Sequence, residues 1–311
     1  MSQQKAQVSK LLTEVSNKYV VENAIAENIL PMLRVKQSSG LIGEYGMGHL
    51  RQENDLMGGR GEARRVDATS YLLDQVYKIQ NHGLQDIVTP DDVENVEAPF
   101  DAEVDKTEDL SSLILVNKEI FARNTVMDSA VVTQGVALVG SDKFSDGVNS
   151  DPLGVAKDAA IATLDGCGHT YNSCIMSAKT YQNLKYHPQI LTTLGFAANR
   201  AGLLSREDIM RALDLKYLFV GEAAYNTAKE GQASVLAQIW GSDMLFYYRP
   251  EAAAKKQVSF GYYLRRLSAV SRNVFKAPLI NPPDSTSIIV QDLYDFRVVN
   301  PAAGYLVEGT F

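Results

Sequence analysis

One glycine-rich stretch, residues 36–80, limits the possible folds of this chain more than any other feature. Within it, two strand-like arms lie on either side of a glycine-rich tip. The returning arm alternates apolar side chains at Tyr71, Leu73, Tyr77 and Ile79, which is typical of a strand with one buried face. Together the two arms predict a long β-hairpin with a glycine-rich tip. It holds too few apolar residues for a core of its own, so we expect it to lie on another surface. Its glycines are Gly40, Gly43, Gly46, Gly48, Gly58, Gly59 and Gly61.

The segments on either side of this hairpin have helical patterns. In residues 1–35, apolar side chains recur at helical spacing, and Pro31 ends a second short pattern. After the hairpin, an acidic stretch over 91–109 leads into a predicted helix of about twenty residues. Asp105 and Glu108 resemble a capping box at its start, where acidic groups suit the helix dipole. Its predicted apolar face contains Leu110, Leu113, Ile114, Asn117, Ile120 and Phe121.

Residues 153–268 alternate helical and strand patterns, after a Gly/Ser/Asp/Asn-rich loop that ends at Pro152. We expect helices over 155–164, around Tyr181–Leu184 and after the N-cap Ser205, with strands at 174–176, 217–220, 244–248 and 258–264. The pattern of the tail, residues 286–311, predicts a hairpin that turns at residues 300–304.

Composition narrows the class of protein. The chain has 311 residues, a net charge of −7 and no basic block, which argues against a dedicated nucleic-acid binder. No apolar run approaches the roughly 20 residues that span a bilayer. With two cysteines in a chain of this length, we expect a reducing compartment.

Motifs for catalysis or cofactor binding are not found in the sequence, so we predict no catalytic, cofactor or metal site. There is no phosphate-binding Gly-Lys-Ser/Thr loop, no nucleophile elbow, no His-Glu-x-x-His helix and no dinucleotide fingerprint. Cys167, His169 and Cys174 form the best metal-like cluster, but their spacing matches no common zinc pattern, and a structural role is the better interpretation. The acidic stretch is better interpreted as a solvated or intersubunit surface than as a cation site.

Several local strings, in their order, resemble a known family. They are residues 145–152 (SDGVNSDP), 181–188 (YQNLKYHP), 220–228 (VGEAAYNTA) and 239–243 (IWGSD). An arm, a glycine-tipped hairpin, an acid-capped helix, an α/β region and return strands follow one another along the chain. This order resembles the major capsid proteins of tailed bacteriophages, and the resemblance covers essentially the whole chain.

The resemblance implies an α+β fold of the Hong Kong 97-like type. The implied parts are an N-terminal arm (1–35), an extended loop (36–82), a peripheral domain with a spine helix (83–152), an α/β axial domain (153–268) and return strands of the peripheral domain (269–311). It further implies a shell of pentamers and hexamers that encloses double-stranded DNA, in a virion assembled in the cytoplasm of the bacterial host. The expected partners are other copies of the chain, a separate scaffolding protein, a portal, a possible decoration protein, and DNA through non-specific contact alone.

Charge suggests how neighbouring copies meet. Arg60, Arg64 and Arg65 lie at the end of the hairpin, and we hypothesise that they meet an acidic surface of a neighbour. Some members of the family crosslink the loop through a lysine, but no lysine lies between Lys36 and Lys78, so we expect a non-covalent shell. The acidic candidates for this contact are Glu97, Asp101, Glu103 and Asp105.

Two alternatives stay open from the sequence. The first is the shell of an encapsulin-like bacterial compartment, which shares the fold and would be distinguished by a neighbouring gene for cargo. The second is a two-domain α/β enzyme acting on a small molecule, for which the sequence offers no set of catalytic residues.

Overall fold

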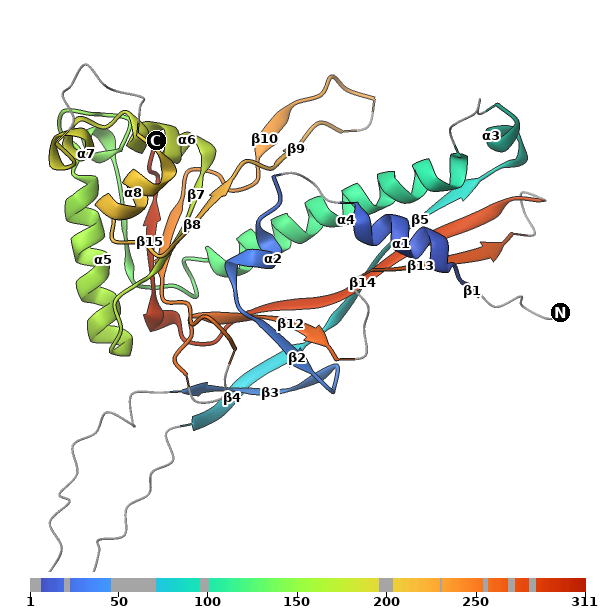
Figure 1. Cartoon of the computed structure of the whole chain (residues 1–311), viewed down its shortest axis with the longest axis horizontal. Coiled ribbons are helices and arrows are strands. Elements are labelled where there is room, and N and C mark those ends of the chain that lie inside the picture. The colour runs from blue at the N-terminus through green and yellow to red at the C-terminus, as the bar shows by residue number, and fades with distance from the viewer. Residues whose placement is uncertain are drawn as a thin grey trace, which may run out of the picture.

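The computed structural model describes residues 7–19, 23–45, 71–95, 101–195, 204–229, 231–253, 257–267, 272–279 and 284–311. The chain is built on two separate larger sheets joined by a long helix, with a hairpin extending from one side (Figure 1). Within these residues, no helix combines the length and apolarity needed to cross a membrane.

The larger sheet is organised around one long strand, β14 (Thr286–Val298). It pairs antiparallel with β13 (Arg272–Pro278) and β12 (Gly261–Arg266) along one side and with β5 (Gln80–Val88) along the other. At the ends, β1 (Gln7–Val8) pairs with β13, and β2 (Met32–Val35) pairs in parallel with β12. The sequence placed 258–264 in the α/β region, whereas the strand begins at Gly261 and joins this sheet.

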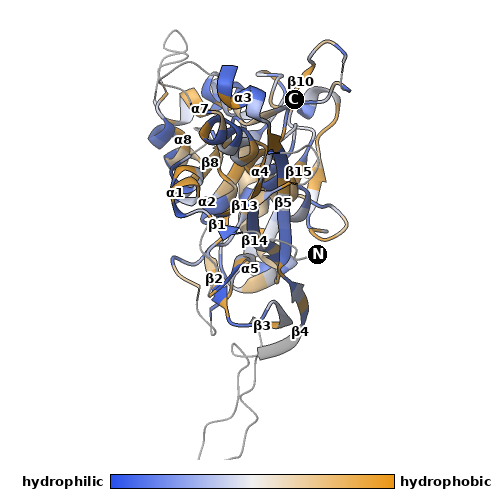
Figure 2. Ribbon diagram, turned by 90° about the vertical axis from the view of Figure 1, so that its right-hand side faces the viewer, coloured by the Kyte–Doolittle hydropathy of each residue, from blue (hydrophilic) through white to orange (hydrophobic). Residues whose placement is uncertain are grey.

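The long helix α4 (Ala102–Val126) has 25 residues and lies along β14 and β5 (Figure 1). The predicted capping box at Asp105 and Glu108 is wrong, because the helix begins earlier: Asp101 is the N-cap and accepts a hydrogen bond from the Glu103 amide. The short α3 (Pro90–Asn95) precedes it, buries none of its residues and is hydrophilic (Figure 2).

Two of the six residues predicted for the apolar face of α4 are misplaced. Leu113 and Asn117 are exposed, whereas Lys118 and Glu119 are buried. The reason is that α4 has neighbours on more than one side, since it contacts the sheet and also the arm helices α1 (Lys10–Lys18) and α2 (Ala26–Ile29). The arm helices themselves confirm the prediction for residues 1–35.

The second sheet has the order β6-β15-β11-β7-β8 and carries helices α5 to α8 around it (Figure 1). Two of its inner strands, β11 and β7, are fully buried, as expected for a sheet covered by helices. The strands are β6 (Gly135–Ala137), β15 (Gly304–Glu308), β11 (Met244–Tyr247), β7 (Ser173–Ser177) and β8 (Tyr217–Gly221). The helices are α5 (Pro152–Cys167), α6 (Ala178–Lys185), α7 (Pro188–Thr193) and α8 (Arg206–Ala212), and a short hairpin follows β8, formed by β9 (Ala224–Asn226) and β10 (Leu236–Gln238).

The predicted C-terminal hairpin is wrong. The bend exists, as a 3-10 turn at Pro301–Ala303, but it carries the chain from β14 in one sheet to β15 in the other. β15 pairs with β11 and β6, and not with β14. Ser205 caps α8 with a full capping box, as expected, and α7 begins at Pro188, where a missing amide hydrogen costs nothing.

Candidate assembly surfaces and the buried charge cluster

The hairpin predicted from the glycine-rich segment is present at its base. β3 (Ser39–Tyr45) and β4 (Tyr71–Lys78) pair antiparallel, and both views show them at the lower end of the molecule (Figures 1 and 2). The tip, including Arg60, Arg64 and Arg65, lies outside the described residues, as does Glu97.

The base of this hairpin is anchored to the large sheet. Ile42, Tyr77 and Ile79 are buried in one cluster with Tyr262 and Leu264 of β12. This packing supports the expectation that the hairpin lies on a surface other than its own core. Polar contacts add to it, because Arg297 on β14 donates from Nε and Nη2 to the Val76 carbonyl at 2.9 and 2.6 Å, and the Lys78 amide donates to Asp295.

The three described acidic candidates gather at the start of α4, but their surroundings differ. Asp101 and Asp105 are exposed, and Asp101 caps the helix. Glu103 pairs with Lys276 of β13 in the same chain. A contact with a neighbour's arginines therefore stays a prediction, and within it Glu103 would have to share its carboxylate with Lys276.

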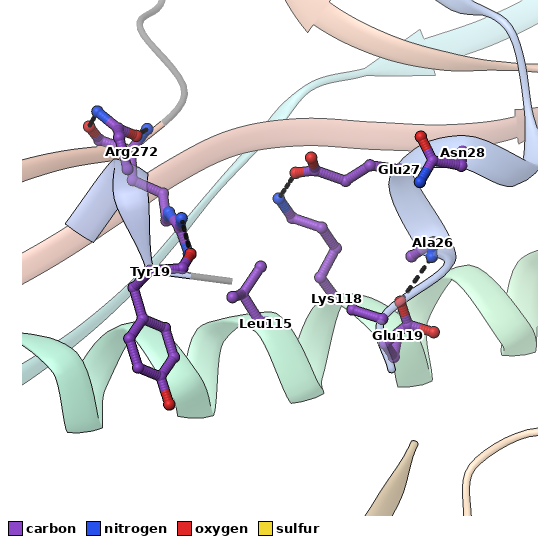
Figure 3. Close-up of a pocket in the computed structure, with 10 residues that line it drawn as sticks. Tyr19, Ala26, Glu27, Asn28, Leu115, Lys118, Glu119 and Arg272 are labelled. Carbon is purple, nitrogen blue, oxygen red and sulfur yellow. Dashed lines mark hydrogen bonds and ion pairs between the residues drawn. The ribbon is translucent and has the colours of Figure 1, made fainter. Parts of the chain in front are cut away.

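A buried charge cluster lies where the arm, α4 and the large sheet meet (Figure 3). The Lys118 ammonium is 2.6 Å from a Glu27 oxygen of α2 and 2.5 Å from an Asp292 oxygen of β14. Asp292 also pairs with Arg265 of β12. Arg272 of β13 donates to the Tyr19 carbonyl at 2.7 Å, so the cluster joins the arm, α4 and three strands of the large sheet.

The electrostatics follow from this geometry. The pKa of Glu27 is lowered. Burial is the largest single influence and would raise this pKa, but the Lys118 ammonium, together with Arg265 and Arg272, outweighs it. Burial also lowers the pKa of Arg272. An unpaired charge at such a site would cost several kcal/mol, so the cluster fixes the positions of its members relative to one another.

Glu119, beside the cluster, links α4 to the arm and to Trp240 through two hydrogen bonds. One of its oxygens accepts from the Ala26 amide of α2 at 2.5 Å, and the other accepts from the Trp240 indole at 2.9 Å. Burial raises the pKa of this carboxyl, and the two hydrogen bonds oppose that shift. Trp240, the single tryptophan, is fully buried in the core that α4 shares with the second sheet.

The cluster of Cys167, His169 and Cys174 has structural contacts, in line with the interpretation preferred from the sequence. Both cysteines are buried; the Cys167 thiol donates to the His169 carbonyl, and the His169 ring stacks on Tyr248 with centroids 4.6 Å apart. Across the part of the chain that the structure describes, no three His, Cys, Asp or Glu side chains come together as a metal site.

Known proteins resemble this chain in sequence and in fold. No protein-family model matches the sequence. The chain is 26% identical over 254 residues to the major capsid protein of Pseudomonas phage JBD67, covering 80% of each protein. It is 23% identical over 310 residues to the major capsid protein of Burkholderia phage BcepMu, covering 97% of this chain and 96% of the relative.

The chain is thus similar to two phage major capsid proteins over most of its length. A solved structure of a phage-related protein from Bordetella bronchiseptica aligns over 99% of both chains, with a TM-score of 0.74 and 21% identity. The expected Hong Kong 97-like α+β fold is thereby confirmed.

Proposed function

We propose that this chain is a phage major capsid protein, and that its copies assemble as pentamers and hexamers into a closed icosahedral shell around double-stranded DNA, inside the host cytoplasm and without any catalytic step. The observation that carries this proposal is the hairpin β3–β4. Its base is anchored in the chain's own large sheet, and both views show it at the lower end of the molecule, away from the second sheet (Figures 1 and 2). Such an extension suits contact with a neighbouring copy.

The domain division supports the same proposal. We assign the arm to 1–35, the extended loop to 36–82, the peripheral domain to 83–152 and 269–311, and the axial domain to 153–268. Three strands depart from this division, because β12 joins the large sheet while β6 and β15 join the second one. The axial domain thus contributes one strand to the large sheet, and the peripheral domain contributes two to the second sheet.

Further partners belong to the same proposal. We infer a separate scaffolding protein, a portal and a possible decoration protein, with DNA held through non-specific contacts that a net charge of −7 keeps weak. The two named relatives favour a phage shell over an encapsulin-like compartment, since both are phage capsid proteins.

The test of the proposal is direct observation of particles. The expressed chain, alone or with a scaffolding protein, should form regular particles of tens of nanometres in negative-stain microscopy and sediment far faster than a monomer. A stable monomer or dimer under both conditions would contradict it.

Contact through the hairpin tip is tested by charge reversal. Changing Arg60, Arg64 and Arg65 together to Glu should abolish or misdirect assembly while leaving the subunit folded, because weak contacts of about 0–1 kcal/mol each are repeated over the whole shell. A matched triple variant with Lys10, Lys185 and Arg211 changed to Glu carries the same change in net charge and should assemble. Normal particles from the first variant would contradict the contact.

A further inference from the structure

A second, shorter hairpin has apolar side chains with no cover. β9 and β10 form a two-stranded sheet, and no third strand pairs with either of them among the residues that the structure describes. On its β10 side, Val235 is 57% exposed and Leu236 is 75% exposed. Isolated two-stranded hairpins are marginal in water, and exposed apolar edges favour association.

The end of this hairpin is nevertheless well organised. The Asn226 side-chain oxygen accepts from the amides of Ala228 and Val235 at 3.0 and 2.9 Å, and the Thr227 amide donates to the Val235 carbonyl at 2.9 Å. These bonds hold the two strands together without help from the rest of the chain. An organised element that presents apolar side chains is suited to binding, because little conformational freedom is lost when it docks.

A complementary surface lies on the far side of the second sheet. α5 packs Ala156, Ala159 and Thr163 inward and presents Ile161 and Leu164 outward, each about half exposed. These two are three residues apart, so they form one apolar patch on the helix. In Figure 1, α5 covers the left side of the sheet, while β9 and β10 project on the other side.

Opposite charges lie beside the two apolar surfaces. Lys229 is exposed near the tip of the short hairpin, and Glu230 follows it in the sequence. Asp158 and Asp165 are exposed beside the apolar patch of α5, where Lys157 is the neighbouring cation. The hairpin thus offers apolar side chains with a cation, and α5 offers apolar side chains in a mainly acidic setting.

We propose that β9–β10 of one copy docks on the exposed face of α5 in the next copy around a pentamer or hexamer. This inference rests on the proposed shell function. A ring of identical subunits needs two different surfaces on opposite sides of each subunit, and these two surfaces meet that requirement. The contact buries Val235 and Leu236 against Ile161 and Leu164 and brings Lys229 close to Asp158 and Asp165.

Disulfide trapping between copies tests this contact. The variant Leu236→Cys/Leu164→Cys, assembled and then oxidised, should give a ladder on a non-reducing gel that ends at five and six subunits. Each single variant should stay monomeric on the gel, because Cys167 and Cys174 are buried. The control Leu236→Cys/Leu113→Cys uses a similarly exposed leucine on α4 and should give no ladder.

A charge exchange gives a second, independent readout. Lys229→Glu should slow assembly, and Lys229→Glu combined with Asp165→Lys should restore much of the rate. Assembled shells that show no disulfide, or in which Leu236→Cys still reacts fully with a maleimide, would overturn the contact and leave the shell function standing. If the unaltered chain forms no shells, both proposals fail.

Discussion

Lys118 should be the most sensitive single position of the buried charge cluster. Its side chain is 1% exposed and lies between Glu27 and Asp292. Lys118→Met keeps most of the aliphatic stem but removes the charge. Breaking a buried pair typically costs about 3–5 kcal/mol. In this variant Asp292 would still pair with Arg265, and water could reach Glu27, so the cost should lie at the lower end of that range. We therefore expect the free energy of unfolding to fall by about 3 kcal/mol.

The assay uses a natural probe. Trp240 is the single tryptophan and is hydrogen-bonded to Glu119, the residue next to Lys118. Its fluorescence during urea unfolding of the unassembled subunit should report the loss of this region directly. The control Lys106→Met removes a similar lysine from an exposed pair with Asp86 at 2.8 Å, and should cost about 0–1 kcal/mol.

A double variant separates burial of charge from loss of packing. If the cost of Lys118→Met arises mainly from the anion left behind, adding Asp292→Asn should cost less than the sum of the two single changes, with a coupling of about 1–3 kcal/mol. Equal midpoints for Lys118→Met and Lys106→Met, or strict additivity in the double variant, would refute the reasoning.

Three further predictions concern neighbouring positions. Burial raises the pKa of Glu119, so the contribution of this carboxyl to stability is fully present in acid and is lost as the pH rises through the folded-state pKa. In urea unfolding, the stability of Glu119→Gln relative to the unaltered chain should therefore increase between about pH 4 and pH 7. A difference that does not change with pH would contradict this. For Glu27 the pH dependence has the opposite sign, because a lowered pKa gives a contribution to stability that is lost as the pH falls. Glu27→Gln should therefore make the free energy of unfolding less sensitive to acid, measured by the same urea unfolding at several pH values. Gly221→Ala should destabilise the subunit and shift its tryptophan emission, because the added Cβ would lie 2.1 Å from the Trp240 ring. In the control Gly140→Ala the added Cβ meets no atom within 4 Å, so the emission should stay unchanged despite some backbone strain. Equal emission spectra for the two variants would contradict the clash.

Local signals in the sequence predicted many of the elements. The helices of the arm, the N-cap at Ser205 and the strands at 174–176 and 217–220 all depend on short-range patterns, and each is present. The glycine-rich hairpin was predicted for the same reason, and its base is paired as expected.

Pairing between distant segments could not be predicted in the same way. The apolar alternation of residues 294–298 and 305–308 is correct for strands, but it carries no information about which sheet each strand joins. Lys118 and Glu119 were likewise absent from the predicted apolar face of α4, because charged residues usually lie in solvent. Their partners, Asp292 and Trp240, are more than a hundred residues away, and no local pattern links them.

The position of α4 limits where the subunit can change shape. Beyond the Glu119–Trp240 bond, Arg123 pairs with Asp243 at 2.8 Å, so the second half of the helix is tied to the second sheet while its length packs on the first. The crossing from β14 to β15 adds a third tie. We therefore infer that pentamers and hexamers of the proposed shell differ mainly in the hairpins, with the two sheets and the arm helices moving as one body. Hydrogen exchange in α4 should then be equally slow before and after assembly, and faster exchange at residues 115–126 in the unassembled subunit would show instead that the sheets move independently.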